Sequence, residues 1–412
     1  MPVRSLQLVL VNTPIGALGS GRGGGVELTL ASLIQGLVRQ NHRVTLVSAK
    51  GSTLPSGCTG ATLVEVEGVD QPSWQHADSD APVSIPRNGL LPALWEAALH
   101  HGKSADAVIN CGYDWLPLWL TPWVQPRLFH LISMGDVAHV MREAIEAVAS
   151  SHPQRLAFHT HRQAADFQLP GTARVVGNGF DLSRYSLQPS CDGPLGWAGR
   201  IAPEKGLEDA ARAAAALGES LLVWGLREDP LYAAAVEAMV PSGTIQWRGF
   251  QPTHALQQQL GSCRALINTP KWNEAYGNVV VEALACGVPV VAYDRGGPGE
   301  LVISGKTGWL VPPDDVQALV TALRHVDQID RFQCRAWAER NPSQDHVPSG
   351  YGNGITVTRC EAYENSPDGH GERGKQHPNF ARLQQLLNGW GISQQPPMVE
   401  KFARNPETKN SS

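Results

Sequence analysis

Apolar residues follow two alternating patterns along the chain. Short continuous apolar runs are typical of strands that are buried on both faces, as in a parallel sheet. Between these runs, apolar residues recur every three or four positions, which is typical of helices that cover a sheet. The first half of the chain is predicted to contain strands over residues 6–12, 43–48, 105–110, 127–132, 156–159 and 173–176. Helices are predicted over residues 26–39, 92–100 and 137–149, and irregular structure over residues 52–86.

Residues 181–194 contain Pro and Ser without periodicity, and we interpret them as a linker. The alternation then restarts. Strands are predicted over residues 195–198, 221–224, 244–247, 265–268 and 288–292, with helices between them that include residues 207–217 and 253–260. The sequence therefore predicts an α/β protein with two facing, Rossmann-like doubly wound domains, residues 1–180 and 195–340. Because such sheets bind ligands at the carboxyl ends of their strands, we expect the site in the cleft between the domains.

The end of the chain departs from this pattern. Residues 347–412 contain only 10 Leu, Ile, Val and Phe residues in 66 positions, which is below the level at which a chain usually forms a core. One short helical pattern remains at residues 380–387. Residues 341–412 are therefore expected to form an atypical, largely disordered tail, and the working part of the chain is expected to end near residue 340.

The amino-acid composition argues against several classes of function. The chain of 412 residues carries 33 Lys and Arg against 38 Asp and Glu, so it lacks the basic balance expected of a nucleic-acid-binding protein. Its seven Cys are scattered without a CxxC pair, which argues against zinc ribbons and favours reduced thiols in the cytoplasm. No apolar stretch reaches the length of a membrane span, and Pro14 soon ends the apolar run near the N-terminus. The sequence leaves the oligomeric state open.

A glycine-rich loop precedes the first predicted helix. Gly19, Gly21 and Gly24 match the GxGxxG pattern of dinucleotide-binding proteins. Two features disfavour such a protein: six residues, 13–18, separate the first strand from the glycines, and the second strand is followed by Lys50 instead of an acid for the ribose. The run at residues 23–25 still lies at a helix N-terminus, where backbone amides favour an anion. A merely flexible loop is the alternative.

Two short motifs suggest metal binding at first sight. Asp78 and Asp80 form a DxD pair, and His159 and His161 lie two positions apart. The acidic pair falls in a polar loop without a preceding strand, and neither pair has an evident third ligand. We interpret both pairs as structural and expect no metal.

Two basic residues occupy the turn after the first strand of the second domain. Arg200 and Lys205 lie in the stretch GRIAPEKG, residues 199–206, where they point to the carboxyl end of the strand. The planar fork of Arg and the point charge of Lys suit a diphosphate. Arg200 could instead pair with a nearby acid.

The stretch at residues 274–291 predicts a loop, a helix, a glycine stop and a buried strand. Asn278 is the expected N-cap, and the backbone amides after Gly277, including that of Val279, are expected to bind an anion. Glu274 precedes the helix and Glu282 lies one turn inside it. Carboxylates beside a phosphate site make sense if they accept hydrogen bonds from sugar hydroxyls. The glycines at 296 and 297 predict a close backbone approach in the following loop.

The GRxxPEKG turn, the pair of glutamates eight positions apart, the GVPVV strand and the DRGGPGE loop together resemble family-4 retaining glycosyltransferases of GT-B fold, over roughly residues 5–340. The resemblance implies that Glu274 contacts the donor sugar, that Glu282 binds the ribose, and that Arg200 and Lys205 contact the diphosphate. It assigns catalytic roles to Glu274, Arg200 and Lys205. The remaining donor-binding residues that we expect are Gly24, Gly25, Gly277, Asn278 and Val279. The implied reaction retains the configuration at C1 and needs no metal or other cofactor.

Three further stretches resemble a narrower group, the cyanobacterial UDP-glucose:tetrahydrobiopterin glucosyltransferases. They are LGSGRGGGVELTL at residues 18–30, CGYDWLPLWLTP at 111–122 and HLISMG at 130–135. This resemblance implies UDP-glucose as donor and tetrahydrobiopterin as acceptor, with Tyr113, Trp115 and His130 near the acceptor. His130 lies inside a predicted strand, so a core position is the alternative. Other open functions are transfer to a lipid, sugar or small metabolite, 2-epimerisation of a nucleotide sugar, and sugar-nucleotide binding without catalysis because of the altered C-terminus.

Overall fold

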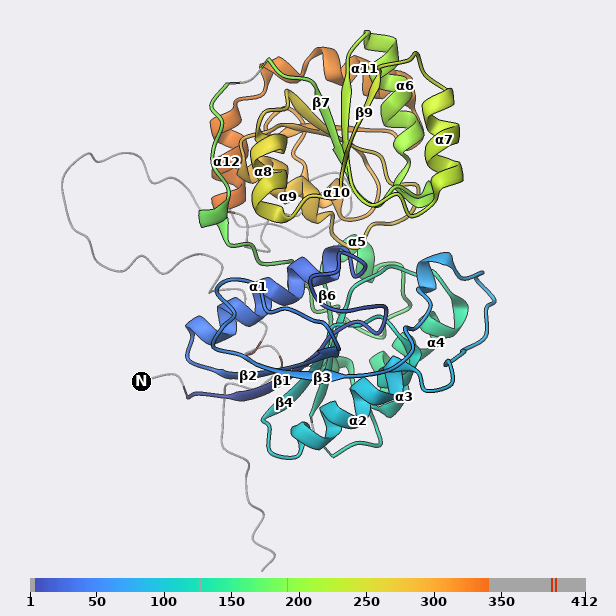
Figure 1. Cartoon of the computed structure of the whole chain (residues 1–412), viewed down its shortest axis with the longest axis vertical. Coiled ribbons are helices and arrows are strands. Elements are labelled where there is room, and N and C mark those ends of the chain that lie inside the picture. The colour runs from blue at the N-terminus through green and yellow to red at the C-terminus, as the bar shows by residue number, and fades with distance from the viewer. Residues whose placement is uncertain (1–3, 126, 191, 341–386, 388–389, 391–412) are drawn as a thin grey trace, which may run out of the picture.

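The computed structural model describes residues 4–125, 127–190 and 192–340, together with Leu387 and Trp390. The first half of the described chain is built on a six-stranded sheet in the order β3-β2-β1-β4-β5-β6, in which every neighbouring pair is parallel (Figure 1). Its strands are β1 (Gln7–Val11), β2 (Arg43–Ala49), β3 (Thr62–Val66), β4 (Ala107–Asn110), β5 (Leu128–Ile132) and β6 (Leu156–Phe158).

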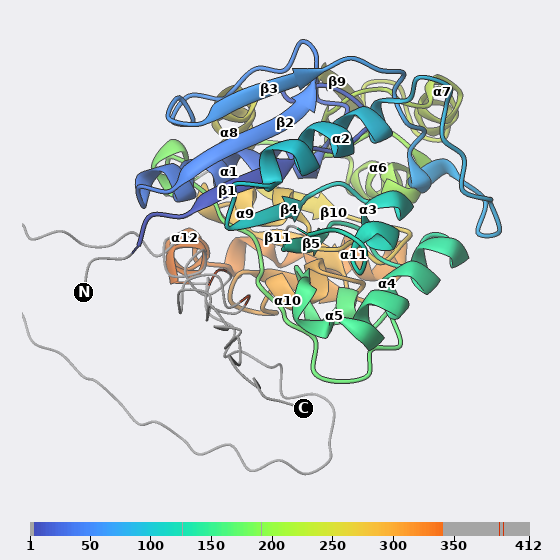
Figure 2. The ribbon, with the colours of Figure 1, turned by 90° about the horizontal axis from the view of Figure 1, so that it is seen from below.

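Helices cover both faces of this sheet because alternate residues of its central strand point to opposite sides. Leu8 and Leu10 of β1 pack in one core with α1 (Gly25–Arg39), whereas Val9 and Val11 pack in another with α2 (Leu90–Gly102). Figures 1 and 2 show α1 on the side that faces the second half of the chain and α2 on the outer side. The other helices are α3 (Trp115–Leu120), α4 (His139–Ser151) and α5 (His161–Ala164).

The second half repeats this plan with a six-stranded parallel sheet in the order β12-β11-β10-β7-β8-β9. Its strands are β7 (Leu195–Ala198), β8 (Leu221–Trp224), β9 (Ile245–Gly249), β10 (Ala265–Asn268), β11 (Val290–Tyr293) and β12 (Gly308–Val311). Its helices are α6 (Leu207–Leu217), α7 (Pro230–Ala238), α8 (Thr253–Gly261), α9 (Asn278–Ala285), α10 (Pro298–Leu301), α11 (Val316–Arg324) and α12 (Arg331–Arg340). The predicted fold class, two doubly wound parallel sheets, is confirmed.

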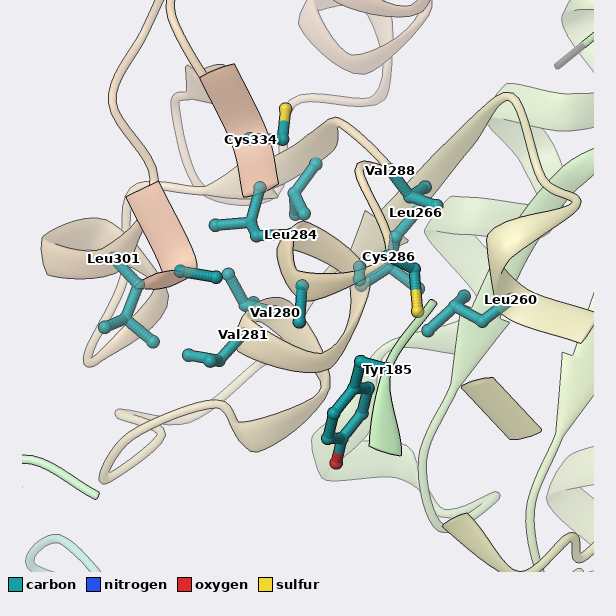
Figure 3. Packing of buried hydrophobic residues seen from close by; sticks show 14 of the residues in the cluster. Tyr185, Leu260, Leu266, Val280, Val281, Leu284, Cys286, Val288, Leu301 and Cys334 are labelled. Atoms are coloured by element: carbon teal, nitrogen blue, oxygen red, sulfur yellow. The ribbon is translucent and has the colours of Figure 1, made fainter. Parts of the chain in front are cut away.

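The core of the second half lies on both faces of its sheet. Helices α6 and α11 pack on one face, and α9 and α12 pack on the other. Figure 3 shows the second cluster, in which Val280 and Leu284 of α9 lie among residues from α12 and the linker. This packing thus fixes helix α9 at a place where the two halves of the chain are in contact. No helix in the described part of the chain has the length and apolar character needed to cross a membrane.

Some elements differ from the sequence prediction. Strand β3 lies inside the stretch 52–86 that was expected to be irregular; it is a half-exposed edge strand, so its apolar pattern is weak. The pattern of apolar residues also gave no prediction of helix α3 at residues 115–120 or of strand β12 at residues 308–311. Residues 173–176 form no strand: Val175 makes a single bridge with Phe158.

The linker and the tail both contribute to the cores. Leu182 and Tyr185 of the predicted linker are buried in the second half. Most of the predicted tail lies outside the described residues, but Leu387 and Trp390 are buried in the core of the first half. The Trp390 ring stacks on Phe129 with 4.8 Å between ring centroids. The predicted working part, which ends near residue 340, therefore does not include these two residues of the first half's core.

Candidate active site

The candidate site lies where loops after β7, β10 and β11 of the second half meet the first turn of α1 from the first half. Lys205 and Glu274 lie in the segments that follow two neighbouring strands, because β7 pairs with β10. The Lys205 Nζ donates to both carboxylate oxygens of Glu274, at 2.8 and 2.7 Å. It also lies 4.8 Å from the centre of the Trp272 ring. Both charged side chains are less than one quarter exposed, which makes this a partly desolvated ion pair.

Arg200 pairs with acids, as the sequence allowed. Its guanidinium donates to Glu204 at 2.9 Å and to Glu228. Glu228 also lies 3.4 Å from the Nε2 of His76, which belongs to the first half. Arg200 also borders Gly24, since a Cβ added to that glycine would lie 3.9 Å from its side chain. The two basic residues of the turn thus both have acidic partners.

The glycine loop before α1 is ordered by an acid that the sequence analysis did not single out. The carboxylate of Glu27 accepts hydrogen bonds from the backbone N–H groups of Gly19 and Gly23, both at 2.8 Å, and of Gly21 at 3.3 Å. Of the residues 23–25 that were expected to bind an anion, Gly23 thus already donates its N–H to a carboxylate of the chain itself. Gly24 precedes α1 with a φ of 55°, a conformation that favours glycine.

Gly277, not Asn278, caps helix α9. Gly277 has a φ of 94°, and Asn278 is the first helical residue. The predicted cap was wrong because the Asn278 side chain is used between the two halves of the chain. Its Nδ2 donates to the Gly25 carbonyl at 3.0 Å, and its Oδ1 accepts from Asn178 at 2.7 Å. Asn278 and Val279 still form the first turn, whose backbone N–H groups point out of the helix end.

Glu282 is buried one turn inside α9, with a residue exposure of 7%. Its carboxylate accepts a hydrogen bond from the Tyr185 hydroxyl at 3.1 Å. Burial raises the pKa of Glu282 to about 7, and the hydrogen bond from Tyr185 opposes that shift. Tyr185 belongs to the linker, and nothing in its local sequence pattern indicated a contact with Glu282.

The three residues expected near an acceptor lie in the first half. His130 is fully buried, with Nδ1 3.2 Å from Asn110 and Nε2 2.8 Å from Thr121, so it occupies the core position that the sequence left as the alternative. This placement does not support contact with an acceptor. The Tyr113 hydroxyl donates to the Gly135 carbonyl at 3.0 Å. Trp115 is half-buried and stacks on Trp119 with 5.6 Å between centroids.

The two candidate metal motifs make ordinary side-chain contacts. Asp80 pairs with His139 at 2.7 Å, and the His159 ring lies 2.8 Å from the Gly177 carbonyl. Among the residues that the structure describes, no three His, Cys, Asp or Glu side chains gather in a way that could hold a metal ion.

Comparison with known proteins defines the class of this molecule. The family described as glycosyl transferases group 1 matches residues 195–341. The D-inositol 3-phosphate glycosyltransferase of Nocardia farcinica is 30% identical over 393 residues, which is 82% of this chain and 85% of that protein. Glycogen synthase of Mycobacterium tuberculosis is 35% identical over 185 residues, 42% of this chain and 44% of that protein. The chain thus spans less than half of the length of this second relative.

The fold is also that of solved structures. The Anabaena protein HepE, solved in complex with UDP and glucose, matches with a TM-score of 0.64 and 18% identity over 81% of this chain and 95% of that chain. Two doubly wound parallel sheets, one in each half of the chain, define the GT-B fold. Within this class, the chain belongs to the group 1 glycosyltransferases.

Proposed function

We propose that the protein is a family-4 retaining glycosyltransferase that moves glucose from UDP-glucose to a small acceptor, tetrahydrobiopterin. The observation that carries this proposal is the Lys205–Glu274 ion pair beside the N-terminus of α9. It combines a cation for phosphate with an acceptor for sugar hydroxyls in one partly desolvated place. The narrower choice of donor and acceptor rests on the sequence resemblance.

The leaving group in this reaction is UDP, so the site must stabilise negative charge on a diphosphate. Arg200 and Lys205 supply two positive charges, and the first-turn amides of α9 add the positive end of a helix dipole. Both basic side chains hold carboxylate partners in the structure. A bound diphosphate would take the place of the Glu204 and Glu228 carboxylates on Arg200, and it would share Lys205 with Glu274.

The two glutamates would bind the donor's hydroxyl groups. Glu274 would accept hydrogen bonds from the glucose hydroxyls, and its contact with Lys205 places its carboxylate beside the diphosphate. Glu282 would accept from the ribose. Because Glu282 is buried against Tyr185, ribose binding would require the carboxylate to exchange or share that hydrogen bond.

Retention at C1 is explained by attack of the acceptor on the face that UDP leaves. The C1–O bond to the β-phosphate breaks as a new C1–O bond to the acceptor forms, and the acceptor proton passes to the departing phosphate oxygen. The protein's part is to hold the donor, stabilise the diphosphate charge and exclude water. No metal is needed in this scheme, since the charge is met by Arg200, Lys205 and the amides of α9.

The acceptor would enter from the first half. Trp115 and Trp119 stack on each other, and Trp119 and Trp123 are 49% and 71% exposed. Exposed indole faces suit a flat pterin ring. Tyr113 immediately precedes Asp114, the N-cap of α3, and is buried. It would therefore pack behind this surface and would not contact the pterin ring.

The test is UDP release from UDP-glucose, with and without tetrahydrobiopterin, in buffer that contains EDTA. The proposal predicts release that depends on tetrahydrobiopterin and persists in EDTA. Release at the same rate without any acceptor would favour hydrolysis or 2-epimerisation instead. Transfer from UDP-glucose to a different acceptor would retain the donor and overturn the acceptor. Tight UDP-glucose binding without turnover would mark a binding protein.

A further inference from the structure

The residues immediately before and after Glu274 both form hydrogen bonds with the first half of the chain. The residue before it, Asn273, donates from Nδ2 to Asp166 at 2.7 Å. The residue after it, Ala275, accepts at its carbonyl from the Thr160 hydroxyl at 2.9 Å. Thr160 and Asp166 flank the short helix α5 of the first half, whereas Asn273 and Ala275 belong to the loop after β10. The loop that carries Glu274 is therefore joined to the opposite half by both of its neighbours.

A second contact holds α5 against the same region. The carboxylate of Glu300, in α10, accepts from the backbone N–H of His161 at 3.2 Å and from that of Arg162. The Arg162 guanidinium in turn pairs with Asp294, just after β11. These bonds run from one half to the other, so they can exist only while the halves are closed on each other. Thr160 is 2% exposed, which keeps water from replacing its bond to Ala275.

The loop that carries Glu274 also makes close backbone contacts within its own half. The Gly297 N–H donates to the Glu274 carbonyl at 2.7 Å. A Cβ added at Gly296 would lie 2.5 Å from the Glu274 nitrogen, so the two backbones are in direct contact. Three kinds of contact therefore position the Glu274 carboxylate. They are the backbone contacts with Gly296 and Gly297, the ion pair with Lys205, and the two hydrogen bonds that the neighbouring residues form with the first half.

We propose that Thr160 and Asp166 are positioning residues for Glu274, and that they make its placement depend on closure of the two halves. This inference rests on the proposed function, in which Glu274 holds the donor sugar. When the halves separate, Asn273 and Ala275 lose their partners and the loop is free to shift. When they close, the carboxylate is brought to its working position at the same moment as water is excluded. A misplacement of about 1 Å is enough to cost roughly a hundredfold in rate.

The test uses the full chain and variants from each half. Thr160→Val keeps the shape of the side chain and removes the hydroxyl, whereas Thr160→Ser keeps the hydroxyl. Thr160 also caps α5 by accepting from the Gln163 N–H, so Asn273→Ala is needed as a variant that breaks the other flank without touching α5. Thr321→Val is the matched control, because Thr321 is exposed on α11 and bonds only within its own helix at Gln317.

Three quantities are measured for each variant: hydrogen exchange of residues 272–278, the Kd of UDP, and kcat with UDP-glucose. We expect Thr160→Val and Asn273→Ala to speed exchange of this segment and to lower kcat by roughly 10-fold to 100-fold. The Kd of UDP should stay within about twofold, because UDP lacks the sugar that Glu274 would hold. Thr160→Ser should restore most of the activity, and Thr321→Val should behave as the wild type.

The outcomes separate the inference from the proposed function. Unchanged exchange at residues 272–278 in both variants overturns the inference, and so does faster exchange with an unchanged kcat. An equal loss of UDP binding and kcat would show general damage and would also overturn it. If the wild type does not turn over UDP-glucose, the proposed function fails. The exchange measurement then decides alone whether the first half orders this loop.

Discussion

The ammonium group of Lys205 bridges both carboxylate oxygens of Glu274, at 2.8 and 2.7 Å. The two residues are 69 positions apart and come from loops after neighbouring strands of one sheet. One belongs to a basic turn and the other to a pair of glutamates, which are separate sequence motifs. Their contact brings together the cation and the acid to which the proposed transfer reaction assigns diphosphate binding and hydroxyl binding.

Removal of the Lys205 ammonium tests this pairing. Lys205→Ala should lower kcat by roughly 10²-fold to 10³-fold, the scale seen when one charge-stabilising group is removed from an active site. Adding Glu274→Gln should recover some thermal stability lost in the single variant, because the unpaired carboxylate is then neutral. Steady-state kinetics and melting curves check both effects. Lys103→Ala, at an exposed position, is the control, and an equal loss there would argue against a specific role for Lys205.

The buried carboxyl of Glu282 should make stability depend on pH. Its pKa is raised from 4.5 to about 7 by burial, so the folded protein keeps a proton that the unfolded chain releases. Stability from this group is therefore lost as pH rises from about 4.5 to about 7. The Tm of Glu282→Gln, relative to wild type, should rise across that window. Glu96→Gln, exposed on α2, should show no such trend. A difference in Tm for Glu282→Gln that does not change with pH would contradict the assignment.

His130 should make the folded protein less stable as pH falls into the acid range, which is the opposite of the pH trend expected for Glu282. Burial lowers its pKa from 6.5 to about 3, so the unfolded chain binds a proton that the folded protein does not. This group therefore reduces stability as pH falls from about 6.5 toward 3. His130→Asn should lose about 1–3 kcal/mol at pH 8, where its former partners Asn110 and Thr121 are left without the ring. That loss should shrink at pH 5. Urea unfolding at the two pH values measures it, with His100→Asn as the exposed control.

The contact of Trp390 with the first half predicts that the end of the chain stabilises the fold. Trp390 is 4% exposed and stacks on Phe129. Trp390→Ala should cost about 3–5 kcal/mol of unfolding free energy, the usual cost of removing a large buried ring. Trp123→Ala, at a position 71% exposed, should change it by less than about 0.5 kcal/mol. If the two variants unfold at the same urea concentration, Trp390 does not belong to the core.

Periodicity predicted the fold well because strands such as β1 and β10 are continuously apolar and are buried on both faces. Motif spacing also pointed to Lys205 and Glu274, since turns after parallel strands gather at one sheet edge. Edge strand β3 was missed because its residues are half-exposed and carry no such signal.

Contacts between the two halves could not be predicted in the same way. The bonds of Asn278 to Gly25 and of Thr160 to Ala275 join positions more than 100 residues apart. Their existence depends on how the halves close, which no local pattern encodes. Glu27 differs, since it lies four residues after Gly23. An acid in the first turn of a helix that follows a glycine loop was a local signal that could have indicated its capping role.

The proposed reaction transfers glucose from UDP-glucose with retained configuration at C1. Proton NMR of the product formed with tetrahydrobiopterin reads the anomeric configuration directly. We predict an α-linked glucoside with UDP released in equal amount, and loss of both in Glu274→Gln. A β-linked product, or undiminished transfer by Glu274→Gln, would contradict the account.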